Sequence, residues 1–289
     1  MAYVISIINM KGGVSKTTIT VNLAACLARD YGKRVLVVDL DTQVNATLSL
    51  MPPLHFAKLK EEELTLKRLI NQGLQPSLTK VGIEAIIQTK ICQIPKLDLL
   101  PGDLDLYNDL WLATVVYGQS SHSQINFEKT WNLIEDNLIR DILAPVEDIY
   151  DFILIDFSPA DNLITRSGVL ASDLYLIPAK PEPLSVVGIG MLESRIARLK
   201  KSKRSDIKLL GIALTSLGRA TNMAEKIQNR LAADFGNGQI FQTEIPLNVD
   251  VAKAVDYFRP VVINSPQSKG AKAFTSLTAE FMQRLVVIK

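Results

Sequence analysis

The 289 residues carry 32 basic and 30 acidic side chains, and 47% of the residues are hydrophobic, which is enough to fill one large core and excludes an intrinsically disordered protein. The two cysteines, Cys26 and Cys92, lie far apart without a C-x-x-C spacing, so a disulfide framework, a zinc site and an iron–sulfur cluster are not expected. The N-terminus has no export signal and no apolar run is long enough to span a membrane, so the protein is expected to be cytoplasmic.

The first predicted element is a buried strand at residues 4–8, and a helix follows from Lys16 to about Ala28. The loop between them holds Gly12 and Gly13 and ends at the helix N-terminus. The unpaired backbone N–H groups and the helix dipole favour an anion there, and glycine lets the backbone approach it closely. The stretch therefore predicts a phosphate-binding loop.

Lys16 and Thr17 supply the polar side chains that such a loop needs. Lys16 provides a positive charge for β- and γ-phosphate oxygens, and the Thr17 hydroxyl can complete a Mg²⁺ shell. The general P-loop pattern asks for glycine where this chain has Met10 and Ser15. If residue 15 has a negative φ, serine costs little; if it needs a positive φ or contacts phosphate, nucleotide affinity should be impaired.

A second buried strand is predicted at residues 34–41, with Asp39 and Asp41 at its C-terminal end, where ligands of open α/β sheets gather. Asp41 could orient an attacking water or organise Mg²⁺ through a water; the alternative is a carboxylate that caps a helix. Residues 51–96 are predicted to be an insertion on the same domain, with a short helix from Glu61 to Ile70 and turns elsewhere.

The middle of the chain predicts a strand at 97–100 and helices at 103–116 and 127–143. The helices are expected to bury apolar residues that include Leu110, Leu133, Ile134 and Leu138. Residues 151–156 form a further apolar strand that ends in Asp156, the Walker B arrangement, in which the carboxylate can hold Mg²⁺ through a water. The alternative interpretation of the loop at residues 11–18 is a chance pair of glycines beside lysines that are exposed to water. Under that interpretation the carboxylate at the end of this strand would be a coincidence.

The last part of the chain continues the alternation of strands and helices. Strands are predicted at 173–178, 208–215 and 239–243, and helices at about 183–201, 222–235 and 268–285, the last with Phe274, Leu277, Phe281 and Leu285 on its buried face. The pattern predicts an α/β fold: one mostly parallel, twisted sheet with helices on both faces.

Charge is distributed unevenly along the sequence. Residues 1–150 carry 14 basic and 17 acidic side chains, and residues 151–289 carry 18 basic and 13 acidic ones. A polyanion would therefore bind the second half. The candidate contacts, each of which alone could be no more than a solvated face, are Arg198, Lys200, Lys201, Lys203, Arg204 and Arg219.

Several segments together resemble the ParA/MinD family of P-loop NTPases. The sequence KGGVSKT at 11–17 is similar to the family's deviant Walker A box, KGGxGK[ST], and departs from it at Ser15. Further similar segments occur in the family's order: DLDTQVNAT at 39–47, LPGDLDL at 100–106, DFSP at 156–159, IPAKPEPL at 177–184 and IPLN at 245–248. The chain thus resembles a single ParA-type deviant Walker ATPase domain over residues 1–289.

This resemblance implies ATP and Mg²⁺ as cofactors and assigns expected roles to residues. Lys11 is expected to reach a second nucleotide across a two-fold interface; the alternative is a solvated lysine at the loop entry. The expected catalytic residues are Lys11, Lys16 and Asp41, and the expected Mg²⁺ ligands are Thr17, Asp41 and Asp156. Expected nucleotide contacts are Lys11, Gly12, Gly13, Val14, Ser15, Lys16, Thr17 and Thr18, with Pro246 beside the base.

The resemblance also implies a function. A ParA-type protein is a slow, partner-stimulated ATPase that dimerises with ATP, binds DNA without sequence preference and associates with the nucleoid. It partitions a plasmid or chromosome with a ParB-like or cargo-adaptor protein. Positioning of a protein cargo, a MinD-like membrane ATPase and a metabolic enzyme on the same fold are the alternatives. The tail after Arg284 shows no amphipathic helix with a basic face, so no membrane partner is expected.

Overall fold

The computed structural model describes residues 1–75, 78–107, 112, 118, 126–202, 204–217 and 222–288. Within these residues seven strands form one sheet in the order β3-β2-β4-β1-β5-β6-β7, and every strand ladder in it is parallel. The strands are β1 (Tyr3–Ile7), β2 (Val35–Asp39), β3 (Leu97–Leu100), β4 (Phe152–Asp156), β5 (Leu174–Ala179), β6 (Lys208–Leu217) and β7 (Ile245–Pro246).

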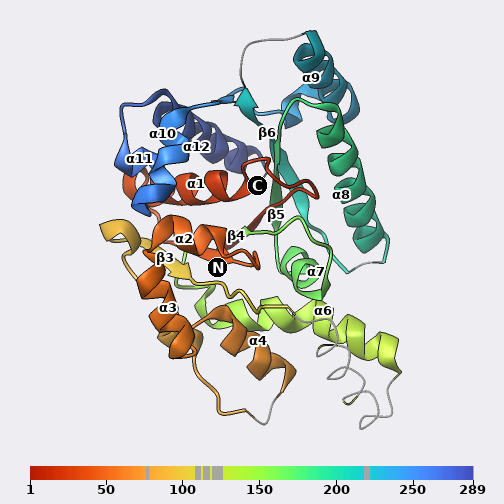
Figure 1. Ribbon diagram of the computed structural model, residues 1–289. Coiled ribbons are helices and arrows are strands. Elements are labelled where there is room, and N and C mark those ends of the chain that lie inside the picture. Colours follow the sequence, from red (N-terminus) through yellow and green to blue (C-terminus); the bar gives the residue numbers. More distant parts are fainter. Residues whose placement is uncertain are drawn as a thin grey trace.

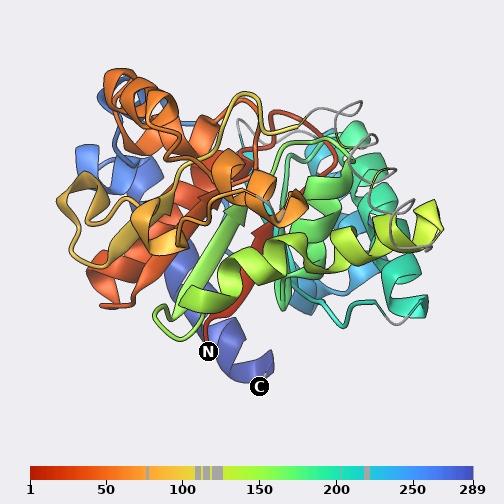
Figure 2. The same ribbon diagram turned by 90° about the horizontal axis from the view of Figure 1, so that it is seen from below.

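Helices cover both faces of this sheet (Figures 1 and 2). One face packs against α4 (Leu66–Leu74), α6 (Phe127–Leu143), α7 (Leu163–Leu170), α8 (Pro183–Lys201) and α9 (Asn222–Phe235). The other packs against α1 (Lys16–Asp30), α2 (Asn45–Leu50), α3 (Pro53–Glu61), α11 (Val261–Asn264) and α12 (Lys269–Ile288), with α10 (Val249–Ala254) beside them. Among the described helices, none combines the length and the apolar character needed to cross a bilayer.

Alternation within the central strand explains why both faces are covered. Val4 lies in the core on the α8 side, whereas Ile5 and Ile7 lie in the core on the α1 side, and all three are buried. Successive side chains of a strand point to opposite faces, so a continuous apolar run fits only a sheet that is buried on both sides. The predicted α/β fold with a parallel sheet is confirmed.

The register of the central strands brings the acidic strand ends together. Ile7 at the end of β1 pairs with Asp156 at the end of β4, and Asp39 at the end of β2 pairs with the same Asp156. The carboxyl ends of parallel strands meet at one edge of a sheet, where ligands of this fold class bind. The loop that follows β1 leaves from this edge.

Some predicted elements differ in the structure. Pro53 does not stop regular structure but begins α3, and the acidic run Glu61–Glu63 lies at the end of that helix, so the helix predicted over 61–70 is replaced by α3 and α4. Proline fits the first helical position because its missing N–H would be unpaired there anyway. The strand predicted at 239–243 is wrong: a short 3₁₀ helix, Asn237–Gln239, precedes one isolated bridge at Ile240.

The predicted burial of side chains is mostly, but not entirely, correct. Phe274, Leu277, Phe281 and Leu285 are all buried on α12, as is Leu138 on α6. Leu133 is 54% exposed, because it lies on the opposite side of α6 from the sheet. Leu110 and most of the helix predicted at 103–116 lie outside the described residues.

Two glycines give a matched test of this packing. A Cβ added at Gly168 in α7 would stand 2.6 Å from Leu40 and 2.9 Å from Phe157, whereas a Cβ at Gly190 in α8 would meet no described atom within 4 Å. We expect Gly168→Ala to lower the free energy of unfolding by about 1–3 kcal/mol, because the core is already full. Gly190→Ala should raise it by up to about 1 kcal/mol through helix propensity. Urea denaturation of both variants checks this, and equal effects would contradict it.

Candidate nucleotide-binding site

The loop between β1 and α1 has a backbone that favours glycine at two positions. Gly13 has φ +70°, and Ser15, the N-cap of α1, has φ +68° and ψ +29°, the left-handed region. The side chain of Ser15 makes no capping hydrogen bond to α1, although its carbonyl accepts from the N–H of Ile19. Serine therefore occupies a position with a positive φ, not the negative φ at which it would cost little. In this conformation serine has a conformational cost that glycine does not have.

Lys16 lies inside the site with its charge turned toward the loop. The residue is 7% exposed, and its Nζ donates to the carbonyl oxygen of Lys11 at 3.0 Å. Burial lowers the pKa of the ammonium group, and the neighbouring charges of Asp156 and Asp41 oppose that shift. A buried ammonium group with one backbone acceptor at the mouth of a helix N-terminus is suited to an anion.

Asp156 accepts hydrogen bonds from two threonines of α1. The Thr17 hydroxyl donates to Oδ2 at 2.7 Å, and the Thr20 hydroxyl donates to Oδ1 at 3.2 Å. The carboxyl group is fully buried, and this burial, with the charge of Asp39, raises its pKa to about 8. Thr17 and Asp156 thus present hydroxyl and carboxylate oxygens side by side, and hard cations such as Mg²⁺ prefer oxygen ligands.

Asp39 and Asp41 have different environments. Asp39 is fully buried and accepts from the backbone and the hydroxyl of Thr47, both at 2.7 Å, and from the backbone of Asp41 at 3.1 Å. Burial raises the pKa of Asp39 to about 6. Asp41 accepts from the backbone of Gln43 and from the side-chain amide of Asn45, both at 3.0 Å. Asp41 thus closes the turn before α2, while Asp39 anchors that turn to the sheet.

Lys11 is held by a residue for which the sequence predicts no role. Its Nζ lies 3.0 Å from Oε2 of Glu182, which precedes α8. The backbone of Lys11 also donates to Oδ1 of Asn9, whose amide donates to the carbonyl of Pro178. The P-E-P segment is recognisable only as part of a motif, and nothing local in the sequence indicates that its glutamate contacts Lys11.

The remaining loop residues suit a phosphate group. Gly12 and Gly13 are exposed, Val14 is buried, and Thr18 lies in the first turn of α1, which begins at Lys16. A Cβ at Gly12 would be in ordinary van der Waals contact with Pro159, at 3.9 Å. Across the described residues, no three His, Cys, Asp or Glu side chains converge as a ready metal cluster.

Pro246 lies at the end of β7, on the edge of the sheet. Ile245 in the same strand pairs with Thr215 of β6, and the Thr215 hydroxyl donates to the carbonyl of Val14 at 3.2 Å. The base-binding role of Pro246 stays a prediction. Its neighbour Ile245 pairs with the residue that contacts the loop, Thr215.

The predicted DNA-contact residues do not all behave alike. Arg198, Lys200 and Lys201 are exposed on the last turns of α8. Arg204 is 22% exposed and pairs with Glu135 and Asp136 of α6, so phosphate would have to compete with two carboxylates for it. Lys203 and Arg219 lie outside the described residues.

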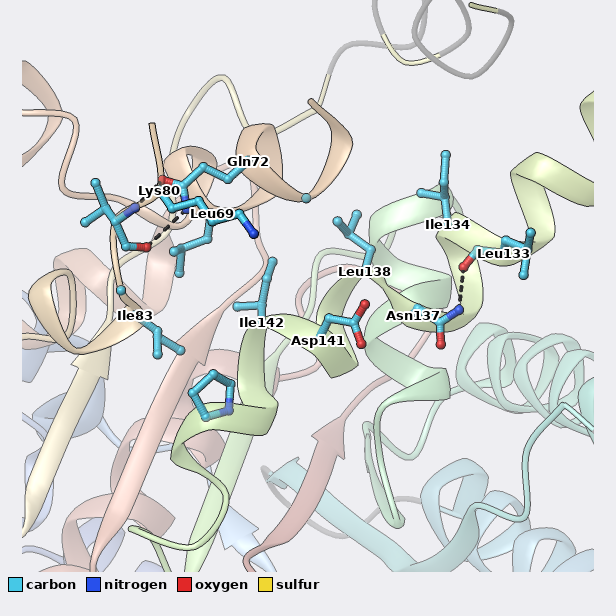
Figure 3. Close-up of a pocket in the computed structure, with 14 residues that line it drawn as sticks. Leu69, Gln72, Lys80, Ile83, Leu133, Ile134, Asn137, Leu138, Asp141 and Ile142 are labelled. Carbon is cyan, nitrogen blue, oxygen red and sulfur yellow. Dashed lines mark hydrogen bonds between the residues drawn. The ribbon is translucent and has the colours of Figure 1, made fainter. Parts of the chain in front are cut away.

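A separate cavity of about 560 Å³ lies between α4, the segment 80–83 and α6 (Figure 3). Its floor is apolar, with Leu69, Ile83 and Ile142 among its lining residues. The Gln72 amide is already paired with the backbone of Val81 in both directions, at 2.9 and 3.1 Å. None of its lining residues belongs to the phosphate loop, so the cavity is distinct from the candidate site.

Three comparisons place this geometry among known proteins. A family model described as "AAA domain" matches residues 2–209. The sporulation initiation inhibitor protein Soj of Bacillus subtilis is 29% identical over 97% of this chain and 98% of its own length, and the chromosome partitioning protein ParA of Caulobacter vibrioides is 27% identical over 97% and 94%. The crystal structure of cobyrinic acid a,c-diamide synthase from Mycobacterium smegmatis, with bound ADP and magnesium, aligns with a TM-score of 0.70 at 23% identity over 100% of this chain and 97% of its own.

The backbone at residue 15 leads to a test. Ser15→Gly should raise the free energy of unfolding relative to Ser15→Ala by about 1 kcal/mol, because only glycine avoids the cost of the left-handed region. Both variants lose the same hydroxyl, so their difference isolates the backbone. Chemical denaturation of the two nucleotide-free proteins measures it, and equal stabilities would mean that φ at residue 15 is not positive in solution.

Burial of Asp156 predicts a pH dependence. Between the ordinary pKa of 3.8 and about 8, the folded protein retains a proton that the unfolded chain has released. The free energy of unfolding should therefore fall as pH rises, by up to about 1.4 kcal/mol per pH unit. Asp156→Asn should flatten the slope between pH 5 and pH 8, measured by urea denaturation without nucleotide or Mg²⁺. Asp105→Asn is the control: Lys60 lowers the pKa of exposed Asp105, so this carboxylate changes the pH dependence of stability only at more acidic pH. A slope that is unchanged in Asp156→Asn would refute the assignment.

Proposed function

We propose that this protein is an ATP-dependent dimerising switch that binds DNA without sequence preference. The chain belongs to the ParA/MinD-type AAA-domain family of P-loop ATPases. The observation that carries the proposal is the convergence of two buried residues, Lys16 and Asp156, with Thr17 at the mouth of the loop between β1 and α1. The ADP and magnesium bound in the similar synthase structure support ATP and Mg²⁺ as cofactors.

In this proposal each loop residue has a stated role. The backbone N–H groups of residues 12–18 and the Lys16 ammonium group would bind the phosphates, and the oxygens of Thr17 and Asp156 would hold Mg²⁺. Bound Mg²⁺·ATP would supply the phosphoanhydride bond that is hydrolysed and the metal charge that neutralises the phosphate oxygens. Asp41 would orient the attacking water while it accepts from Gln43 and Asn45, since a carboxylate has about four acceptor positions. Pro246 borders the base.

Lys11 is the proposed link to a second copy of the chain. Lys16 already serves the phosphates of its own site, so a second lysine at the loop entry is better used across a two-fold interface. That use requires Lys11 to leave Glu182, and a partly exposed ion pair of this kind stabilises by about 0–1 kcal/mol. The contact can therefore break when a nucleotide of a partner offers stronger charge.

The proposed DNA surface is the C-terminal end of α8. Arg198, Lys200 and Lys201 are exposed there and are free to bind phosphates without losing a described carboxylate partner. Dimerisation doubles the number of phosphate contacts, and the slope of log affinity against log salt grows by about 0.9 for each phosphate neutralised. Doubling therefore converts weak binding into useful binding, from which nucleoid association and the positioning of a cargo follow.

One experiment tests the switch: gel filtration and DNA binding at several salt concentrations with ATP–Mg²⁺, with ADP–Mg²⁺ and without nucleotide. We expect the dimer and tight DNA binding with ATP alone. Lys16→Ala should lose the stabilisation by ATP, which at a hundred times the dissociation constant is about 2.7 kcal/mol. Lys11→Ala should keep ATP binding but lose the dimer and DNA, and Lys200→Glu with Lys201→Glu should lose DNA alone.

Lys58→Ala is the control for the loss of a positive charge. It removes one exposed lysine of α3, which lies outside the phosphate loop and outside α8. This variant should behave as the wild type in all three states. DNA affinity that does not depend on nucleotide would reject the switch, and an unchanged melting temperature with ATP–Mg²⁺ would reject nucleotide binding itself.

A further inference from the structure

The loop between β4 and α7 contacts the phosphate loop and is short and well anchored. Pro159 in this loop lies against Gly12, 3.9 Å from the place of a Cβ. At its far end Asn162 caps α7: it accepts from the backbone of Thr165 at 2.9 Å, and its own backbone donates to the Thr165 hydroxyl at 3.0 Å. Asp161 immediately precedes this cap and lies two residues after Pro159.

Asp161 pairs with arginines from two helices. Its Oδ2 accepts from Nη2 of Arg195 in α8, and its Oδ1 lies 3.4 Å from Nη1 of Arg166 in α7. Arg195 also points Nη1 toward the sulfur of Met10 in the phosphate loop, at 3.7 Å. A thioether is a weak acceptor, so the carboxylate of Asp161 is the stronger partner. Arg195 therefore touches the loops on both sides of the nucleotide site.

Both arginines lead to the basic end of α8, where α6, α7 and α8 lie on the same side of the sheet (Figure 1). Arg195 lies one turn before exposed Arg198 on one continuous helix. Arg166 pairs with Glu135 of α6, which is only 4% exposed and also accepts from Arg204 at 2.5 Å. Two arginines thus share one buried carboxylate, and a change in the position of one alters the balance of charge around the other.

We infer that Asp161 is a positioning residue that couples the nucleotide site to the basic end of α8, through Arg195 along the helix and through Arg166 and Glu135 to Arg204. The inference rests on the proposed function, whose regulation it specifies. When the loop at Pro159 adjusts to a bound phosphate, Asp161 shifts relative to both arginines. The direction and position of Arg198, Lys200 and Lys201 then change together, because they belong to one helix.

The surroundings of Arg195 make this contact sensitive. Burial lowers the pKa of the Arg195 guanidinium, as do the nearby charges of Arg166 and Arg198, and Asp161 opposes them. Without the carboxylate of Asp161, Arg195 would lose its described ion-pair partner and would lie near Arg166, whose charge Glu135 still balances. Asp161 and Glu135 are each shared by two arginines, with Arg166 common to both, so a change at one carboxylate alters the balance of charge around the other.

The test uses the full chain with Mg²⁺·ATP as the probe. Asp161→Asn, which keeps the shape and removes the charge, should leave the thermal shift by ATP unchanged but reduce the ratio of DNA affinities with and without ATP by about tenfold, within the usual range of coupling. Hydrogen exchange gives a readout without DNA. Amides of Ile196–Lys201 should change their exchange when ATP is added to the wild type, and should not in Asp161→Asn.

Arg195→Gln is the second variant, and the double variant should be no worse than either single one, as expected of a coupled pair. Asp234→Asn, which removes the partner of Arg230 on exposed α9, is the matched control and should keep the full ratio. If ATP does not alter DNA affinity in the wild type, the proposed function fails, while hydrogen exchange still decides on Asp161. If Asp161→Asn keeps the ATP-dependent exchange of residues 196–201, or if the wild type shows none, the coupling is refuted.

Discussion

The hydrogen bond from Thr17 to Asp156 is the contact on which the site depends. It joins the first turn of α1 to the end of β4, and the register places Asp156 beside Ile7, where β1 passes into the phosphate loop. One buried carboxylate thereby fixes the relative positions of three elements. Thr20 binds its second oxygen, so the group is satisfied on both sides and holds the helix N-terminus over the end of the sheet. Lys16 is buried in the same place, where the charge of Asp156 opposes the lowering of its pKa by burial.

The sequence predicted the elements whose pattern is local. β2 and β4 are unbroken apolar runs that end in Asp39 and Asp156, and α6 and α9 have the bounds predicted for them, 127–143 and 222–235. Prediction failed where local signals have two meanings. Pro52 and Pro53 fit both a stop and a helix start, and the burial of apolar side chains around α3 by the rest of the fold decides for the start. Leu133 shows the same limit, since its apolar character did not determine which way it faces.

Within the site, the residue types were predictable and their partners were not. Lys16, Thr17 and Asp156 were predicted from their places along one loop and one strand end, and Lys11 from the resemblance to the deviant Walker A box; their roles stay predictions. The left-handed backbone at Ser15 does not, because serine is compatible with either sign of φ and the turn geometry decides. Arg204 belonged to a run of positive charge, yet its guanidinium is bound to Glu135 and Asp136, which come from a helix far away in sequence. Charge counted along a sequence therefore overestimates the charge available to a polyanion.

The position of α8 relates these observations to one another. Its first turns pack on the phosphate loop, where a Cβ at Gly188 would stand 3.0 Å from Asn9 and 3.5 Å from the Lys11 side chain, and its last turn carries exposed charge. A helix of 19 residues spans about 28 Å, so one rigid element joins the two regions. The ion pair of Lys11 with Glu182 adds at most about 1 kcal/mol to the nucleotide-free arrangement. A ligand at a hundred times its dissociation constant stabilises the bound state by about 2.7 kcal/mol. The ion pair can therefore bias the position of Lys11 but cannot prevent its release.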